Sequence, residues 1–217
     1  MTIATLLAPI APLSTDDTVA DALVHLAEEH VSHLPVVSPD GALDAIVSDT
    51  ALRMHPDPET PVGALVAGPP ISALPETHVF DAAHLMRTHA LSVLPVTDAD
   101  GQYVGLTVRQ DVFAQLAHML ATEEPGAIVV LDADRRDFSL GQVAQLIEQN
   151  GVRILSVSTE DDPGAGRVQV TLKLNVSDTS RVRHIMEHYD YRVTAVFDEQ
   201  QDDLEGRAAA FLHYLEV

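Results

Sequence analysis

The sequence predicts a mixed α/β (α+β) fold in which two copies of a small β-α-β-β-α unit are followed by a β-α-β-β-α-β domain. Two observations carry this prediction. At a fixed offset of 60 residues, the windows 19–41 and 79–101 are identical at nine of 23 ungapped positions, which indicates an internal duplication. After residue 126 the repeat does not continue, and a different order of helix and strand patterns begins.

The first copy is read from apolar periodicity and from its turn residues. Polar side chains at 14–17 are typical of a helix start, and the apolar residues that follow recur at the spacing of one helical face. The predicted elements are a lead-in at 2–10, a helix from Val19 to about His30, a strand at 32–37, a turn at Asp40-Gly41, a strand at 43–47 and a short helix that begins at Ser48.

The second copy repeats this order after a proline-rich connector at 55–61, which is typical of a break between units. Its hairpin is the clearest local signal, because two apolar strands flank a polar turn that ends in Asp100-Gly101. The predicted elements are a short segment at 62–66, a helix over 79–86, a hairpin at 94–106 and a longer helix that carries Val112, Phe113, Leu116, Met119 and Leu120.

The remaining chain predicts a split β-α-β arrangement of the ferredoxin-like type. Residues 168–176 alternate strictly between apolar and polar side chains, as in a strand with one buried face. The predicted elements are strands at 127–131, 152–157, 168–176 and 191–197, a helix over 140–147 that ends at Asn150-Gly151, a turn at 161–166, a helix capped by Ser177-Asp178, and a final helix over 202–217 with Leu204, Ala208, Phe211 and Leu215 on one stripe.

Composition narrows the class of protein. Each repeat of about 60 residues would be a marginal domain, so the pair is expected to fold as one unit. The formal net charge of −21 argues against nucleic acid or an anionic membrane as partner. The absence of cysteine excludes disulfides and thiolate metal sites. No apolar run is long enough to span a membrane and no basic, signal-like start is present, so a cytoplasmic location is expected.

The acidic surface has two interpretations. Aspartate is abundant, and Lys173 is the one lysine. This composition is similar to that of salt-adapted, halophilic proteins, in which concentrated salt screens the repulsion. An ordinary acidic protein is the alternative, and the sequence leaves both open.

The Leu-Pro-Val strands at 34–36 and 94–96, the Asp-Gly turns and the duplicated order resemble the CBS domain, which occurs in tandem pairs (Bateman modules). The resemblance places one CBS repeat at 1–56 and a second at 57–122. It implies that an adenosine nucleotide (AMP, ADP, ATP or S-adenosylmethionine) binds in the clefts of the pair. Residues 126–217 resemble an ACT domain, and the whole layout is similar to regulatory proteins of the acetoin-utilisation type. That layout implies a homodimer that acts on a protein target, which the sequence does not identify.

Site residues follow from the CBS resemblance position by position. Asp111 stands where the ribose hydroxyls are bound, and Ala51 replaces that aspartate in the first copy, with Asp49 two positions away. Val108 stands where the phosphate side calls for Ser or Thr, with Thr107 adjacent and Arg109 as a source of charge. The candidate nucleotide-binding residues are Val93, Leu94, Pro95, Val108, Arg109 and Asp111 in the second copy and His33, Leu34, Pro35 and Ser48 in the first.

Other chemistries find less support. The ACT-like segment has Arg135-Arg136-Asp137-Phe138 where amino-acid sensors carry Asp-x-Pro-Gly, and Phe138 would obstruct the approach that a glycine permits. Eleven histidines without an HExxH motif predict no metal site. No phosphate loop, GxSxG elbow or nucleophile–base pair is recognisable, so no enzyme is predicted. Two alternatives remain: an interaction scaffold with vestigial pockets, in which Asp111 only caps its helix, and an amino-acid sensor that acts through the ACT-like domain.

Overall fold

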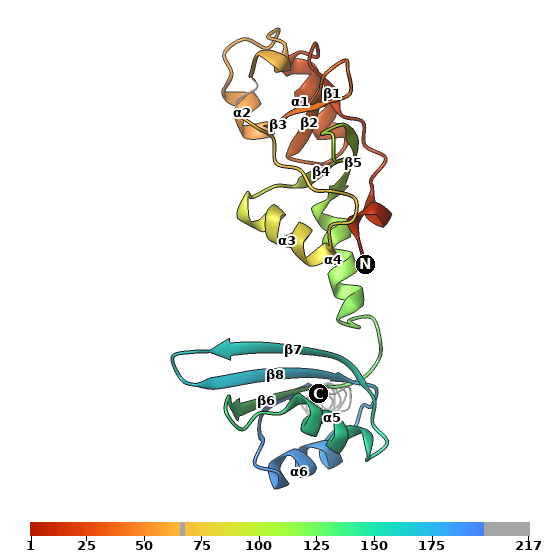
Figure 1. Cartoon of the computed structure of the whole chain (residues 1–217), viewed down its shortest axis with the longest axis vertical. Coiled ribbons are helices and arrows are strands. Elements are labelled where there is room, and N and C mark those ends of the chain that lie inside the picture. The colour runs from red at the N-terminus through yellow and green to blue at the C-terminus, as the bar shows by residue number, and fades with distance from the viewer. Residues whose placement is uncertain (66–67, 198–217) are drawn as a thin grey trace, which may run out of the picture. The chain divides into compact units, whose positions relative to one another are not determined.

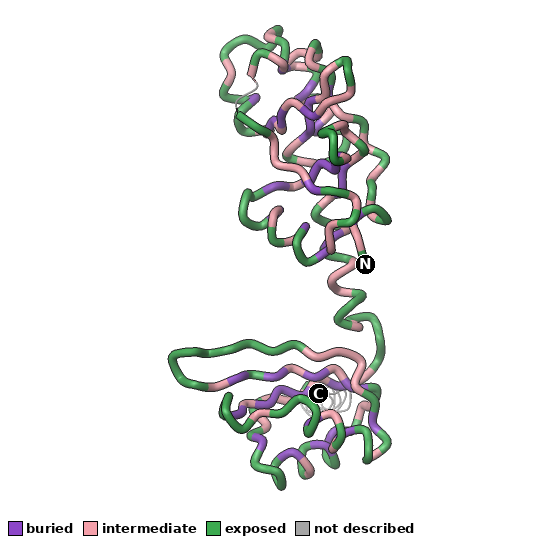
Figure 2. The backbone as a smooth tube through the Cα atoms, viewed as in Figure 1, coloured by how far each residue is buried: buried purple, intermediate pink, exposed green. Residues whose placement is uncertain are grey.

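The computed structural model describes residues 1–65 and 68–197. The chain forms two compact units, Met1–Leu116 and Ala117–Val217 (Figure 1). The helix predicted over 202–217 lies outside the described residues. Buried residues concentrate on the strands and on one side of the helices of each unit (Figure 2).

The first repeat folds in the predicted order. β1 runs parallel to β2, and β2 pairs with β3 in antiparallel register. The helix cap lies one residue beyond the predicted 14–17 stretch: the Thr18 hydroxyl accepts the Asp21 N–H at 3.1 Å, and the Asp21 carboxylate accepts the Thr18 N–H at 3.2 Å. The elements are β1 (Leu13–Ser14), α1 (Val19–Glu28), β2 (His33–Val37), β3 (Leu43–Ser48) and α2 (Asp49–Met54).

The second repeat reproduces the first at the same 60-residue offset. Even the irregular backbone positions recur: His30 and Ala90 both have φ of 54°, and Gly41 and Gly101 have φ of 88° and 81° in the hairpin turns. The counterpart of β1 is reduced to a single parallel bridge between Ala73 and Val96. The elements are α3 (Val79–Thr88), β4 (Val93–Thr97), β5 (Tyr103–Val108) and α4 (Arg109–Met119).

Each repeat is completed by the segment that precedes the other repeat. The 3-10 helix η1 (Ile3–Leu6) packs in the second repeat, where Ile3 is fully buried and its N–H donates to Thr77 O at 3.0 Å. The 3-10 helix η2 (Val62–Leu65) packs in the first repeat, where Val62 N–H donates to Asp17 O at 2.8 Å. The two repeats therefore share their cores through exchanged lead segments.

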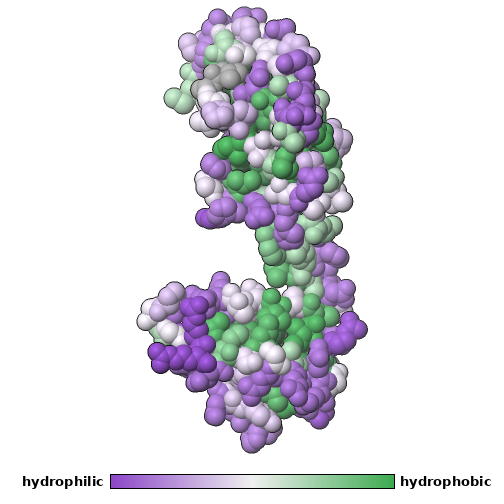
Figure 3. All heavy atoms as spheres, viewed as in Figure 1, coloured by the Kyte–Doolittle hydropathy of each residue, from purple (hydrophilic) through white to green (hydrophobic). Residues whose placement is uncertain are grey.

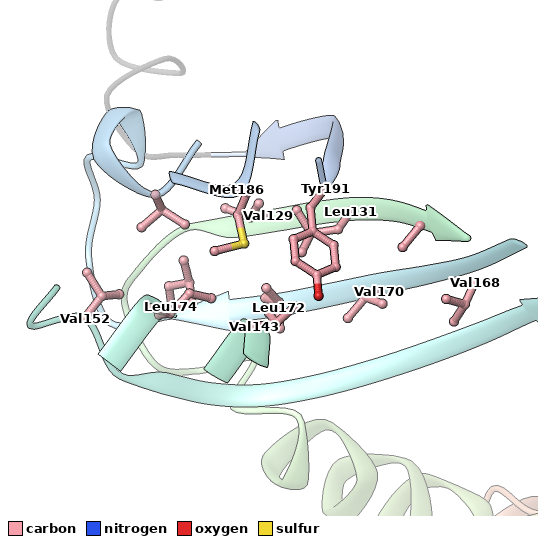
Figure 4. Close-up of a cluster of buried hydrophobic side chains, with 13 residues drawn as sticks. Val129, Leu131, Val143, Val152, Val168, Val170, Leu172, Leu174, Met186 and Tyr191 are labelled. Carbon is pink, nitrogen blue, oxygen red and sulfur yellow. The ribbon is translucent and has the colours of Figure 1, made fainter. Parts of the chain in front are cut away.

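The C-terminal unit has the predicted β-α-β-β-α-β order. Its antiparallel sheet has the strand order β7-β8-β6-β9, and both helices contribute to the core on one face of it (Figure 4). The predicted alternation is confirmed over 168–174, where the alternate apolar residues are buried, whereas the strand ends at Leu174 and not at residue 176. The elements are β6 (Ile128–Asp134), α5 (Leu140–Glu148), β7 (Ile154–Asp162), β8 (Arg167–Leu174), α6 (Ser180–His188) and β9 (Arg192–Phe197).

One further local prediction in this unit needs correction. β7 continues through Asp161 and Asp162, which were expected in the turn, because both pair with β8. Asp178 caps α6 as predicted: its carboxylate accepts the Ser180 N–H at 2.9 Å, from the position before the N-cap residue Thr179. β9 has a register shift opposite Val130 and Leu131, and beyond this shift Phe197 is 62% exposed.

No helix within 1–65 and 68–197 combines the length and the apolar character that crossing a membrane requires.

The exchanged lead segment makes a stability prediction. Replacing Ile3 by Ala removes a fully buried side chain from the second repeat, and such truncations cost about 2–5 kcal/mol. Val24→Ala, at a position that is 58% exposed on α1, should change stability by less than about 0.5 kcal/mol. Urea unfolding followed by circular dichroism measures both variants, and equal effects would contradict the exchange.

Candidate functional site

Two cavities lie in the first unit, and the duplication relates their linings. The larger, which we call the Arg109 cleft, has a volume of about 680 Å³ and is lined by residues 8–10, 29–31, 92, 108–110 and 113. The smaller, the His33 cleft, has a volume of about 310 Å³ and is lined by residues 33, 45–46, 48, 65, 68–71 and 91. Both volumes fall in the range of small-molecule sites, and both linings combine residues of the two repeats.

Arg109 is anchored at the edge of its cleft. Its backbone N–H donates to Ser92 O at 2.9 Å, and its side-chain Nε donates to Leu91 O at 3.0 Å. The two terminal amino groups of the guanidinium have no hydrogen-bond partner among the residues that the structure describes. Since Arg109 is also the first residue of α4, its charge adds to the partial positive charge of a helix N-terminus. This end of the cleft is suited to an anion.

His33 connects the two repeats. Its Nδ1 accepts the Ser92 N–H at 3.2 Å and lies 3.1 Å from the Ser92 hydroxyl, which accepts the Ser32 N–H at 3.0 Å. Burial of the ring lowers the pKa of His33 below its usual value, and the positive charge of Arg109 lowers it further. Because Nδ1 accepts an amide N–H, the neutral ring carries its proton on Nε2.

The structure brings together four of the predicted site residues, two in each cleft. Val108 and Arg109 line the Arg109 cleft, and His33 and Ser48 line the His33 cleft. The Ser48 hydroxyl also accepts the Ala51 N–H at 3.2 Å as the cap of α2.

The other predicted residues lie elsewhere. Leu34 and Leu94 are fully buried in the cores of their own repeats, facing the helices. The adjacent strand positions Val93, Pro35 and Pro95 are buried too, and none of them lines either cleft. Asp111 is half-buried on the first turn of α4 and does not line the Arg109 cleft.

Thr107 does not replace the missing hydroxyl at position 108. It pairs across the hairpin with Leu94, and cross-strand partners lie on the same face of a sheet. Thr107 therefore faces the core of the second repeat, where it is fully buried and its hydroxyl has no hydrogen-bond partner among the described residues. The hydroxyl next to Val108 is turned away from the cleft.

Several residues that line the clefts were not predicted from the sequence. Ser92 and Phe113 line the Arg109 cleft, and the lead segments 8–10 and 68–71 each form one wall of a cleft. A signal for them was present, because Pro9 and Pro69, like Ser32 and Ser92, are identical at the 60-residue offset. The repeat pattern in the sequence does not predict that each lead segment packs against the other repeat.

A third hollow lies on the outside of the second repeat between α3 and α4. It has a volume of about 400 Å³ and a mostly apolar lining that includes Ala83, Met86, Val112 and Leu116. Phe113 borders it and is 70% exposed. Figure 3 shows apolar atoms breaking the mostly hydrophilic surface of the first unit in the region of these helices.

Within the described part of the chain, no three His, Asp or Glu side chains gather as a metal site would require.

The lowered pKa of His33 predicts a pH dependence of stability. A histidine whose native pKa is lowered binds fewer protons when folded than when unfolded, so its contribution makes stability rise with pH. The free energy of unfolding begins to fall as the pH drops below about 6.5, the pKa of histidine in the unfolded chain, and this loss is complete below the pKa of His33 in the folded protein. His33→Gln should flatten this part of the profile. The control His89→Gln, at an exposed position, should leave the profile as in the wild type. Urea unfolding between about pH 5 and 8 measures the profiles. Identical profiles for the wild type and His33→Gln would show that His33 is not the source of the pH dependence.

Comparison with known proteins supports the reading of the first unit. The protein-family model of the CBS domain matches residues 6–56 and 62–118. A CBS domain-containing protein of Dictyostelium discoideum is 30% identical over 128 residues, which cover 52% of this chain and 88% of that protein. The inosine-5′-monophosphate dehydrogenase of Mycobacterium leprae is 29% identical over 172 residues, 78% of this chain and 32% of that enzyme. The chain thus spans about a third of the length of that relative.

One solved structure agrees on the fold of the first unit, and a second is reported beside it. The crystal structure of a CBS domain pair/ACT domain protein from Thermotoga maritima is 21% identical, with a TM-score of 0.51, and covers 55% of this chain and 99% of that chain. The structure of CBSX2 in complex with AMP is 26% identical with a TM-score of 0.47, and covers 54% of this chain and 96% of that chain. On the two matches of the family model and the Dictyostelium relative, the chain described here belongs to the CBS-domain proteins and carries a tandem pair of CBS domains.

Proposed function

We propose that this chain is a regulatory protein that binds an adenosine nucleotide in the Arg109 cleft of its CBS pair. The candidates are AMP, ADP, ATP and S-adenosylmethionine. The observation that carries the proposal concerns Arg109, which begins α4 and lines a cleft of about 680 Å³. Its guanidinium is held in place by a hydrogen bond to the Leu91 carbonyl. In a chain with a net charge of −21, a basic group held in place at the edge of a cleft is a local exception that favours an anionic ligand.

The chemistry of the cleft divides between its two ends. Phosphate oxygens would bind beside Arg109 and the N-terminus of α4, which supplies backbone N–H groups. The base would lie against the apolar lining, where Val108, Ile10 and the ring of Phe113 are available. Asp111 remains the residue that the family resemblance implies for the ribose hydroxyls.

The proposed role is regulatory rather than catalytic. A ligand that prefers one arrangement of the two repeats shifts the population toward it, and the exchanged lead segments that form the cleft walls are the elements through which the repeats would move. The C-terminal unit is proposed as an ACT-like module that dimerises and passes this change to a target protein. The apolar hollow between α3 and α4 is a further surface that supports self-association, which light scattering on the full chain measures.

The amino-acid sensor is the less favoured alternative. In the C-terminal unit, Phe138 packs against the hydrophobic core, and Arg135 is engaged with Asp161 at 3.2 Å. The turn that would receive an amino acid is therefore occupied by the protein's own side chains. The scaffold alternative remains distinct, because it predicts that no nucleotide binds.

Isothermal titration of the full chain with AMP, ADP, ATP and S-adenosylmethionine tests the proposal. At least one should bind, more weakly at high salt because its charge is screened. A hydrogen bond to a charged group contributes about 1.5–3 kcal/mol, so Arg109→Gln should weaken binding about tenfold or more. Arg87→Gln is the matched control, since Arg87 lies on neighbouring α3 and does not line the cleft. If none of the four ligands binds, the proposal is wrong, and the scaffold and the less favoured amino-acid sensor are the readings that remain.

A second substitution tests the ribose assignment separately. If Asp111 accepts the ribose hydroxyls, Asp111→Asn should reduce the affinity of the bound nucleotide about tenfold, as expected for a charge-assisted pair. Asp100→Asn, in the exposed hairpin turn, changes the net charge equally and should leave the affinity unchanged. An unaltered affinity of Asp111→Asn would remove Asp111 from the site while the role of Arg109 stands.

A further inference from the structure

The two clefts differ in the source of their positive charge. The Arg109 cleft contains a guanidinium that is charged at every physiological pH. Among the described residues that line the His33 cleft, His33 is the one titratable group. An anion entering that cleft would meet a cation only when His33 is protonated.

One backbone segment joins the two clefts. Leu91 lines the His33 cleft, and the next residue, Ser92, lines the Arg109 cleft. Arg109 holds this segment through both carbonyls, with Nε on Leu91 O and its N–H on Ser92 O. From the other side His33 Nδ1 accepts the Ser92 N–H. The cation of one cleft and the titratable group of the other are thus both bound to Ser92.

The duplication shows that this arrangement is asymmetric. Position 49 corresponds to position 109, and the Asp49 N–H donates to Ser32 O at 3.0 Å as the Arg109 N–H does to Ser92 O. The charge at this position is reversed in the first repeat. Asp49 pairs with Arg53 on the same helix, with an N–O distance of 2.8 Å, and neither of them lines the His33 cleft.

We propose that the two clefts fill in order: an anionic nucleotide first binds beside Arg109, and the His33 cleft then becomes an anion site through proton uptake by His33. This inference rests on the proposed nucleotide function. A bound phosphate neutralises the Arg109 charge that opposes protonation of the ring, so the first ligand favours the proton and the proton favours the second ligand. Such coupling is reciprocal.

The electrostatic surroundings are consistent with this order. Burial and the charge of Arg109 lower the pKa of His33 in the free protein, so the ring is neutral near pH 7. The other charged groups close to the contact are the Asp49–Arg53 ion pair on α2 and, in the lining of the Arg109 cleft, Glu29 and His30. Protonation at Nδ1 ends its role as acceptor of the Ser92 N–H and leaves the Ser92 hydroxyl, 3.1 Å away, as the new acceptor.

The test combines titration calorimetry with NMR on the full chain, using AMP and, in parallel, ATP. Wild type should bind about one nucleotide at pH 8 and about two near pH 6, on either side of the usual histidine pKa. The pKa of His33, read from its ring signal and assigned by the loss of that signal in His33→Gln, should rise when the first nucleotide binds. His33→Gln should bind one nucleotide at both pH values.

Arg109→Gln gives an independent readout without altering the histidine. In this variant the pKa of His33 should already be raised in the free protein, and nucleotide should no longer change it. Binding of one nucleotide at both pH values with an unchanged His33 pKa would overturn the ordered filling and leave the proposed function intact. Failure of AMP and ATP, and also of ADP and S-adenosylmethionine, to bind at either pH would instead overturn the proposed function itself.

Discussion

Neither CBS repeat completes its own core, and the rest of the first unit depends on this constraint. Ile3 fills the second repeat and Val62 fills the first. The chain that follows each of these residues then forms one wall of a cleft, at 8–10 and at 68–71. The Ala8 N–H donates to Leu106 O at 2.8 Å and holds the first wall against β5. The same apolar burial that stabilises the pair therefore also shapes its binding sites.

The second organising feature is the reversal of charge between two copies of one position. Arg109 and Asp49 begin equivalent helices, and their N–H groups make equivalent hydrogen bonds to Ser92 and Ser32. Their side chains diverge, since Arg109 reaches the backbone between the clefts and Asp49 pairs along its own helix with Arg53. Duplication conserved the backbone geometry while the electrostatic character of the clefts became different.

The sequence predicted the secondary-structure elements in more detail than the arrangement of the candidate binding site. Helices and strands of the first unit follow the apolar periodicity. The offset of 60 residues holds for the first residues of the pairs α1/α3, β2/β4, β3/β5 and α2/α4. Which candidate residues share a cleft could not be predicted, because the resemblance names positions along a strand without saying which face they occupy. Leu34 and Leu94 face their own helices, whereas His33 and Val108, on the other face, line the clefts.

What the sequence determined by itself is local or repeated: the duplication, the hairpin turns at Gly41 and Gly101, and the alternation of β8. These follow from periodicity and from backbone conformations that few residues adopt. Only the tertiary structure decided that η1 and η2 exchange repeats, that Ser92 joins the two clefts and that β9 has a register shift opposite Val130 and Leu131. These outcomes depend on contacts between residues far apart in the chain, and a local sequence pattern does not predict such contacts.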